Sequence, residues 1–188
     1  MNHETDTDTA ATEQRYLTFR LSGATYGIGI LKVQEIIGLL PLTPVPRTPE
    51  FVRGVINLRG RVIPVVDLRR RFGMEVLPDS DRTCIVITQV DGDKGLMTMG
   101  VVVEDVAEVV DIPREVIADV PEFGAGVDTE FLVGMGKVAD EVVMLLDIDR
   151  VLSGKDVALV ADLAGDEDAD KTGATIGESA DETTEGVE

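Results

Sequence analysis

Few side chains in this sequence are of the types that catalyse reactions. The only histidine is His3, in a polar N-terminal stretch without an apolar pattern. Histidine is the usual general base of nucleophilic triads and a common metal ligand. Because the rest of the chain lacks it, we expect neither a histidine-dependent triad nor a histidine-ligated metal site.

Two glycine motifs resemble phosphate-binding loops only superficially. Gly27-Ile28-Gly29 lacks the third glycine that precedes a helix in dinucleotide-binding loops, and Gly134-Met135-Gly136-Lys137 lacks the P-loop spacing. Both motifs fit better as glycines of strands and turns. The sequence therefore indicates no cofactor.

The acidic pairs and the single cysteine also have simple structural interpretations. Asp91 and Asp93 lack the other spaced ligands of a calcium loop, so we predict no metal site there. Glu104-Asp105 lies among valines and implies no substrate pocket. Cys84 lies in an apolar run, where we expect a small buried residue instead of a reactive thiol. We therefore predict that the protein is not an enzyme.

One polar pairing suggested by the sequence suits contact better than catalysis. The turn Asn57-Leu58-Arg59-Gly60 presents an arginine whose planar guanidinium can pair with a carboxylate. Glu35, in the strand that precedes this segment, is the candidate partner. Either the pair orients a docking surface, or it is an internal salt bridge with no role in binding.

The segment from Asn57 to Leu68 indicates which elements must position this arginine. Gly60 permits a tight turn, and the β-branched run 62–66 predicts a strand. Pro64 cannot donate a ladder hydrogen bond, so this strand should lie at an edge or carry a bulge. Because apolar residues point to both of its faces, the strand needs a barrel interior on one side and a second body on the other.

The composition favours a mainly β protein. The chain has 188 residues, of which 44% are hydrophobic but only 4% aromatic, so we expect an aliphatic, strand-rich core. It contains no signal peptide and no uncharged apolar run of about 18 residues. We therefore expect a cytoplasmic protein without direct membrane insertion.

The net charge of −19 is unevenly distributed. Residues 1–14 carry four acids and no lysine or arginine, and residues 162–188 carry ten acids and one lysine. We expect residues 1–14 and the tail 164–188 to be disordered. An acidic chain repels phosphate backbones, so we predict no nucleic-acid partner and interpret Arg69-Arg70-Arg71 as a solvated helical face. Abundant acids with few lysines are also typical of proteins from a salt-rich, halophilic cytoplasm.

The chain reads as a series of short strands with few helical turns. The predicted elements are a hairpin of 16–21 and 26–30, a stiff proline-rich loop at 39–49, a strand or helical turn at 51–58 broken by Gly54, strands at 83–90 and 96–110, and short helices at 69–72, 113–119 and 156–163.

The two halves of the chain repeat one another. An offset of 73 residues aligns Gly27 with Gly100 and 33–37 with 106–110. An offset of 80 residues aligns two glycines, two phenylalanines and two aspartates, namely Gly54 with Gly134, Phe51 with Phe131, and Asp67 with Asp147. We therefore predict a duplicated β unit of roughly 65 to 80 residues, with two small barrels packed together.

Several of these motifs together resemble the CheW family of chemotaxis coupling proteins. They are Tyr26-Gly27-Ile28, the run 30–36 (ILKVQEI), Thr48-Pro49 with Phe51, the run 54–60 (GVINLRG) and the run 63–68 (IPVVDL). The resemblance implies an all-β fold of two SH3-like five-stranded β-barrels related by internal duplication. It covers about residues 15–163, as two interleaved or successive barrels with a boundary near 72–84, and leaves out 1–14 and the tail 164–188.

The resemblance also implies a function and a site. It implies a non-catalytic adaptor that couples the cytoplasmic tips of chemoreceptors to the regulatory domain of a CheA-type histidine kinase, within membrane-anchored receptor arrays. The receptor-binding residues carried over by motif are Val33, Glu35, Ile36, Asn57, Leu58, Arg59 and Gly60. Arg53 and Gly54 would belong to a segment needed for kinase or receptor coupling, with arginine where relatives often have lysine.

Other functions remain as alternatives. A double-barrel scaffold in a two-component array that does not control motility would have the same motifs. A complete histidine kinase or a receiver-domain fusion would need segments that this sequence lacks. An enzyme would need a convergent polar pocket, and a nucleic-acid-binding SH3-like module would need an aromatic platform.

Overall fold

The computed structural model describes residues 13–92, 95–121 and 129–152. His3, most of the two predicted disordered termini and the predicted helix at 156–163 lie outside these ranges. The strands are β1 Glu13–Leu21, β2 Ala24–Gly29, β3 Val33–Gly38, β4 Val52–Leu58, β5 Arg61–Asp67, β6 Cys84–Gly92, β7 Gly95–Val103, β8 Asp105–Pro113, β9 Leu132–Val138 and β10 Glu141–Leu146. The helical elements are single turns, α1 Leu68–Arg71, α2 Ile148–Val151 and the 3₁₀ turns η1 Ile30–Lys32 and η2 Arg114–Val116.

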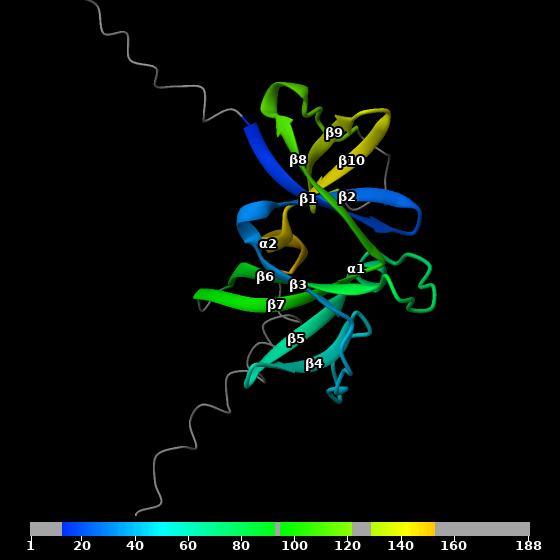
Figure 1. The fold of residues 1–188 in the computed structure, drawn as a ribbon, viewed down its shortest axis with the longest axis vertical. Coiled ribbons are helices and arrows are strands. Elements are labelled where there is room, and N and C mark those ends of the chain that lie inside the picture. Colours follow the sequence, from blue (N-terminus) through cyan, green and yellow to red (C-terminus); the bar gives the residue numbers. More distant parts are fainter. Residues whose placement is uncertain (1–12, 93–94, 122–128, 153–188) are drawn as a thin grey trace, which may run out of the picture.

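The strands form two five-stranded sheets, which confirms the all-β prediction. Sheet A has the order β8-β1-β2-β10-β9, and sheet B has the order β3-β6-β7-β5-β4. Figure 1 shows sheet A above and sheet B below, with the short helix α2 between them. The helix predicted at 113–119 is reduced to the 3₁₀ turn η2.

Each sheet takes strands from both halves of the chain. The hairpin β1–β2 inserts between β8 and β10, and β6–β7 inserts between β3 and β5. The insertions create one parallel pair in each sheet, β2 with β10 and β5 with β7. The two sheets are therefore interleaved along the sequence, and each half supplies a hairpin to the sheet that is built mainly by the other half.

Backbone bonds beyond the named strands draw the two edges of each sheet together. The chain that follows β3 reaches edge strand β4, where Thr43 and Val55 exchange two backbone hydrogen bonds of 2.9 Å. The chain that follows β8 reaches β9 in the same way, through Ala118 and Met135 at 2.8 and 2.9 Å. This satisfies backbone groups that an open sheet edge would leave unpaired.

The internal duplication is confirmed at residue level. Asp67 ends β5 and Asp147 follows β10, and the side chain of each caps the next helical turn. Their amides donate to equivalent carbonyls, Asp67 to Phe51 at 2.8 Å and Asp147 to Phe131 at 2.9 Å. Because these bonds depend on backbone position, their recurrence shows that both repeats fold alike.

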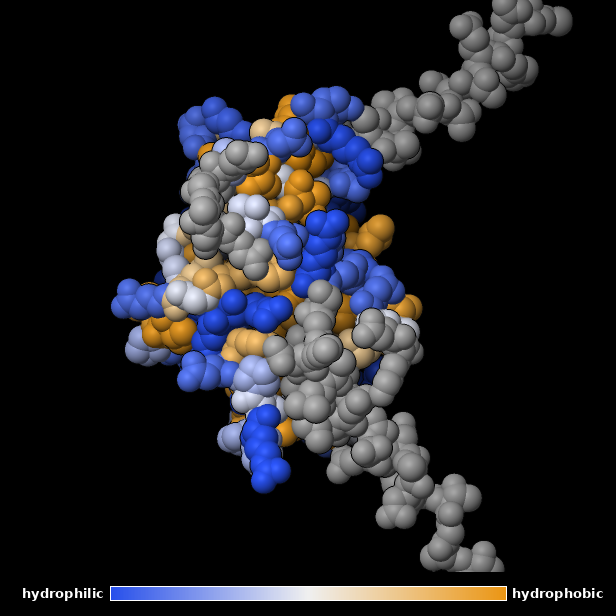
Figure 2. Space-filling view, turned by 180° about the vertical axis from the view of Figure 1, so that it is seen from behind, coloured by the Kyte–Doolittle hydropathy of each residue, from blue (hydrophilic) through white to orange (hydrophobic). Residues whose placement is uncertain are grey.

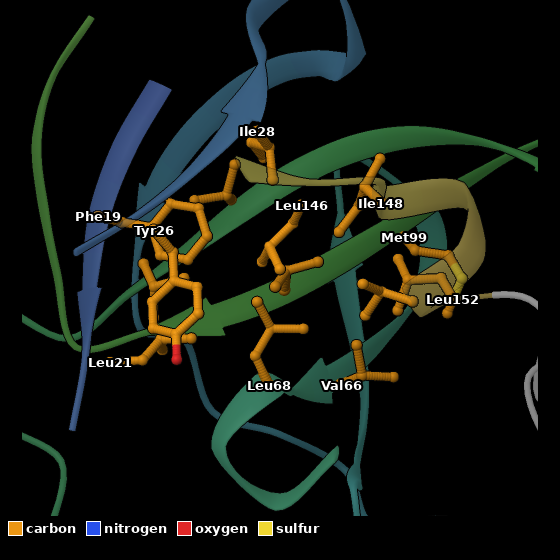
Figure 3. Packing of buried hydrophobic residues seen from close by; sticks show 14 of the residues in the cluster. Phe19, Leu21, Tyr26, Ile28, Val66, Leu68, Met99, Leu146, Ile148 and Leu152 are labelled. Atoms are coloured by element: carbon orange, nitrogen blue, oxygen red, sulfur yellow. The ribbon is translucent and has the colours of Figure 1, made fainter. Parts of the chain in front are cut away.

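The largest hydrophobic cluster, which we call the central cluster, lies between the two sheets. Phe19, Tyr26 and Ile28 from sheet A meet Val66 and Met99 from sheet B. Figure 3 shows these side chains converging with Ile148 of α2 and with Leu152, which follows α2. Two smaller clusters, around Val65 in sheet B and Leu145 in sheet A, fill the opposite faces. Strand β5 therefore contributes to two cores, as its two apolar faces predicted.

Two local predictions need correction. Strand β5 is not an edge strand, because it pairs with both β4 and β7. Its pairing with β7 begins only at Val65, so the hydrogen bonds between β5 and β7 do not need an N–H donor from Pro64. The predicted bulge lies in the partner strand β4, between Val52 and Gly54. Gly54 likewise does not end β4, because the strand continues through it to Leu58.

The surface alternates between polar and apolar residues. Figure 2 shows hydrophobic residues reaching the surface among hydrophilic ones, notably in the upper half, where sheet A lies. No helix within the described ranges is long and apolar enough to cross a membrane.

Candidate docking surface

The predicted pair of Arg59 and Glu35 is present as a bidentate ion pair. The two terminal guanidinium nitrogens of Arg59 donate to the two carboxylate oxygens of Glu35, each at 2.8 Å. These bonds lower the pKa of the Glu35 carboxyl below its ordinary value, because they favour its charged form. The Arg59 side chain remains 73% exposed, so one face of the guanidinium is open to a partner.

Local sequence explains how Arg59 is presented. Arg59 and Gly60 form the two-residue loop between β4 and β5, and both have positive φ, 54° and 84°. Such a turn matches the twist of the flanking strands but strains any residue other than glycine or asparagine. The Asn57 side-chain oxygen accepts a hydrogen bond of 2.9 Å from the Gly60 amide, which stabilises the loop. The hairpin thus fixes the arginine above Glu35 on β3.

The predicted apolar residues do not all share this surface. Ile36 is 44% exposed, but adjacent strand residues point to opposite faces, so it does not lie on the same side of β3 as Glu35. Val33 is half-buried and packs against the central cluster. Leu58 packs against the smaller cluster of sheet B. The structure therefore brings together the polar pair and its turn and leaves Ile36 as a separate exposed residue.

Arg53 is engaged within the protein. Its guanidinium donates to both carboxylate oxygens of Asp79, at 3.1 and 2.7 Å, and lies 3.5 Å from the buried carboxylate of Asp67. The hydrogen bonds from Arg53 lower the pKa of the Asp79 carboxyl. Arg53 therefore holds the linker between the repeats, which is the segment 72–83 between α1 and β6, against β4.

Gly54 has a steric role. Its φ of 133° is rarely adopted by other residues, and an added Cβ would overlap the carbonyl of Thr43. That carbonyl accepts the Val55 amide and helps to join the sheet edges. The glycine thus permits the close approach on which the shape of sheet B near Arg53 depends.

The interpretation of Arg69-Arg70-Arg71 as a solvated face is wrong for Arg69. The Arg69 side chain is completely buried and donates to Asp67 at 3.0 and 2.7 Å and to the Leu77 carbonyl at 3.1 Å. Its guanidinium also lies 3.4 Å from the carboxylate of Asp79 and 3.6 Å from that of Glu104. Glu104 in turn accepts a hydrogen bond from the amide of Ser22, in the turn between β1 and β2 of sheet A. One arginine therefore links the end of β5, the linker and a turn of the other sheet.

Arg71 departs from the same interpretation in another way. Its guanidinium carbon lies 4.7 Å from the ring centre of Phe51 and 5.5 Å from that of Phe131, the equivalent phenylalanine of the second repeat. Only Arg70 of the three is exposed. No sequence signal distinguished the three arginines, because their burial depends on residues distant in the chain.

The structure describes two of the other residues considered for chemistry, Asp91 and Cys84. Asp91 pairs with Lys32 at 2.9 Å, Asp93 lies outside the described residues, and no metal-ligand cluster occurs within those residues. Burial raises the pKa of the half-buried Cys84 thiol, which opposes thiolate formation.

Glu104 and Asp105, for which the sequence implied no substrate pocket, line a hollow at the surface. Its volume is about 600 Å³. Asp105 faces Arg82 at 3.5 Å and Glu104 accepts the Ser22 amide, so both carboxylates have partners within the protein.

Comparison with known proteins gives one consistent family. The sequence model described as CheW-like domain matches residues 15–156. Chemotaxis protein CheW of Klebsiella aerogenes is 37% identical over 151 residues, covering 80% of this chain and 89% of that protein. Protein FrzA of Myxococcus xanthus is 32% identical over 147 residues, covering 76% and 88%. The crystal structure of the scaffolding protein TtCheW from Thermoanaerobacter tengcongensis superposes with a TM-score of 0.69 at 30% identity, covering 82% of this chain and 96% of that one.

Proposed function

This chain belongs to the CheW-like family, and from that membership we propose that it is a non-catalytic adaptor in chemotaxis signalling. In this role it couples the cytoplasmic tips of chemoreceptors to a CheA-type histidine kinase. It works in the cytoplasm and reaches the membrane-anchored arrays through protein contacts.

The observation that carries the receptor part of this proposal is the Arg59–Glu35 pair. Glu35 holds the guanidinium through both of its terminal nitrogens, which fixes its plane, while most of the Arg59 side chain stays exposed. A partner therefore meets an arginine whose conformational freedom has already been restricted, and such preorganisation lowers the entropic cost of binding. Arginine is also among the residues enriched at binding hot spots.

Arg53 and Gly54 serve coupling indirectly in this proposal. Arg53 binds Asp79 of the linker. Gly54 allows the backbone of β4 to approach that of Thr43, which joins the edges of sheet B. The Arg59 hairpin and β3 belong to that same sheet. Loss of either residue would thus disturb the docking surface without removing a direct contact.

A reconstitution with defined components tests the proposal. Membrane vesicles that carry a chemoreceptor from the same host are mixed with its histidine kinase and the full-length protein, and then sedimented. We expect the protein to sediment with receptor vesicles and to increase the amount of kinase that sediments. If it sediments equally with receptor-free vesicles, or leaves kinase recruitment unchanged, the adaptor role is wrong.

A further inference from the structure

The duplication allows the Arg59–Glu35 site to be compared with its counterpart in sheet A. The offset of 73 residues places Glu108 of β8 at the position of Glu35, and the offset of 80 places Ala139 at that of Arg59. Ala139 opens the two-residue loop between β9 and β10, with φ of 52° against 54° for Arg59. The backbone conformation of Arg59 is therefore repeated at Ala139 without the arginine, although Asp140 does not share the positive φ of Gly60.

The local registers support this correspondence. Both glutamates lie at an irregularity of strand pairing: Glu35 is the first paired residue after the one between β3 and β6, and Glu108 lies within the one between β8 and β1. At that point the Glu108 backbone exchanges two hydrogen bonds with the Thr18 hydroxyl, at 2.8 and 3.2 Å. Glu108 is thus held on its strand where Glu35 is held on β3.

A hollow lies where the arginine is missing. Glu108, Ala139 and Asp140 line a surface hollow of about 420 Å³ between β8 and the β9–β10 hairpin. Its apolar lining includes Val110, Val138 and Val143, which belong to the cluster inside sheet A. In sheet B, the Arg59 side chain spans the corresponding strands.

The charges in this hollow favour a cation. Its lining contains the acids Glu108, Asp140 and Glu141 but only one base, Arg20, which lies 3.6 Å from Glu141. Within the described residues, no basic side chain pairs with the carboxylate of Glu108 or of Asp140. The equivalent glutamate in sheet B shows which cation this backbone geometry suits, a guanidinium bound through two nitrogens.

We propose that this hollow binds an arginine side chain supplied by a different protein, in the place that Arg59 occupies in the first repeat. The guanidinium pairs with Glu108, Asp140 adds a second negative charge, and the valines contact the arginine methylenes. The inference does not rest on the adaptor function, because the hollow and the repeated site are properties of this chain alone.

The test is an NMR titration of the full-length protein with acetyl-arginine-amide. Acetyl-citrulline-amide, which has nearly the same shape but no charge, is the control probe. We expect saturable shifts of the Thr18, Val110 and Asp140 amides with the arginine probe only. Absence of saturation, or equal binding of the citrulline probe, would overturn the proposal.

Three variants localise the binding. Glu108→Gln should weaken binding of the arginine probe at least tenfold, and Ala139→Arg should abolish it by filling the hollow from within the chain. Asp111→Asn is the matched control, because it removes one acid from the same strand outside the hollow and should leave binding unchanged. Unchanged binding in Glu108→Gln contradicts the proposed site.

A second copy of this chain is the competing source of the arginine. Shifts of the same amides on concentrating the protein without a probe, absent in Glu108→Gln, would assign the hollow to self-association. That result would overturn its assignment to a different protein.

Discussion

Arg59 combines a fixed position with an exposed charge. Because Glu35 holds its guanidinium, Arg59→Ala should remove a preorganised contact while leaving the cores of both sheets intact. We expect receptor affinity to fall by about tenfold to a hundredfold, as is common when an interface anchor is truncated, with little change in melting temperature. Vesicle co-sedimentation and thermal melts measure the two effects.

Arg15→Ala is the matched control for this substitution. Arg15 forms an exposed ion pair with Asp111 at 3.4 Å on sheet A, so its loss removes the same charge away from the predicted surface. If both variants bind receptor equally well, the placement of the receptor surface at Arg59 is wrong. If Arg59→Ala unfolds, the pair is structural.

Asp79 should make stability depend on pH. Arg53 holds the pKa of its carboxyl below the ordinary value, so the stabilisation is present above about pH 4, the pKa in the unfolded chain. It is lost as the pH falls through the lower pKa of the folded state. Asp79→Asn should therefore melt at a lower temperature than the parent at pH 7, and this difference should narrow below about pH 4.

Thermal melts from pH 7 to pH 3 measure that difference. Asp81→Asn is the control, since Asp81 is an exposed carboxylate in the same linker. The role assigned to Asp79 is contradicted if the difference stays constant or widens on acidification.

At the scale of elements, the closure of sheet B depends on β4 meeting the chain after β3. Gly54→Ala would place a methyl group against the Thr43 carbonyl and impose a disfavoured φ. We expect a loss of about 1–3 kcal/mol in the free energy of unfolding. Denaturant titration measures this loss, and receptor binding should fall with it.

Gly38→Ala is the control for that substitution. Gly38 ends β3, and a Cβ there would meet nothing within 4 Å. A Gly54→Ala protein as stable as the parent but deficient in coupling would instead make Gly54 a direct contact.

At the scale of the whole molecule, interleaving makes the two halves interdependent. A fragment of residues 1–81 contains two strands of sheet A and three of sheet B, so it completes neither sheet. The central cluster also needs both halves. We expect fragments 1–81 and 82–188 to lack native structure alone and to regain it when mixed.

Circular dichroism and thermal melts of the separate and mixed fragments test this. Recovery of cooperative melting in the mixture shows that the cut itself is tolerated. Cooperative melting of either fragment alone would contradict the interdependence.

Local patterns account for what could be predicted from the sequence. Alternating apolar residues predicted most strands, and the repeated glycines, phenylalanines and aspartates predicted the duplication. The tight turn at Gly60 was also anticipated from the sequence, whereas the Arg59–Glu35 pair could only be offered as a candidate, because its partners lie 24 residues apart at opposite edges of sheet B. These features depend on backbone preferences within short segments, which the sequence carries directly.

The tertiary structure decided which segments meet. Arg69 looks like its neighbours in sequence, yet it is buried because Asp67, Leu77 and Glu104 converge around it from separate elements. The hollow beside Glu108 exists because β8 lies across from a hairpin that carries Ala139. The exchange of hairpins between sheets has no local signature either, since a strand's pattern shows which faces are buried but not which strand lies beside it.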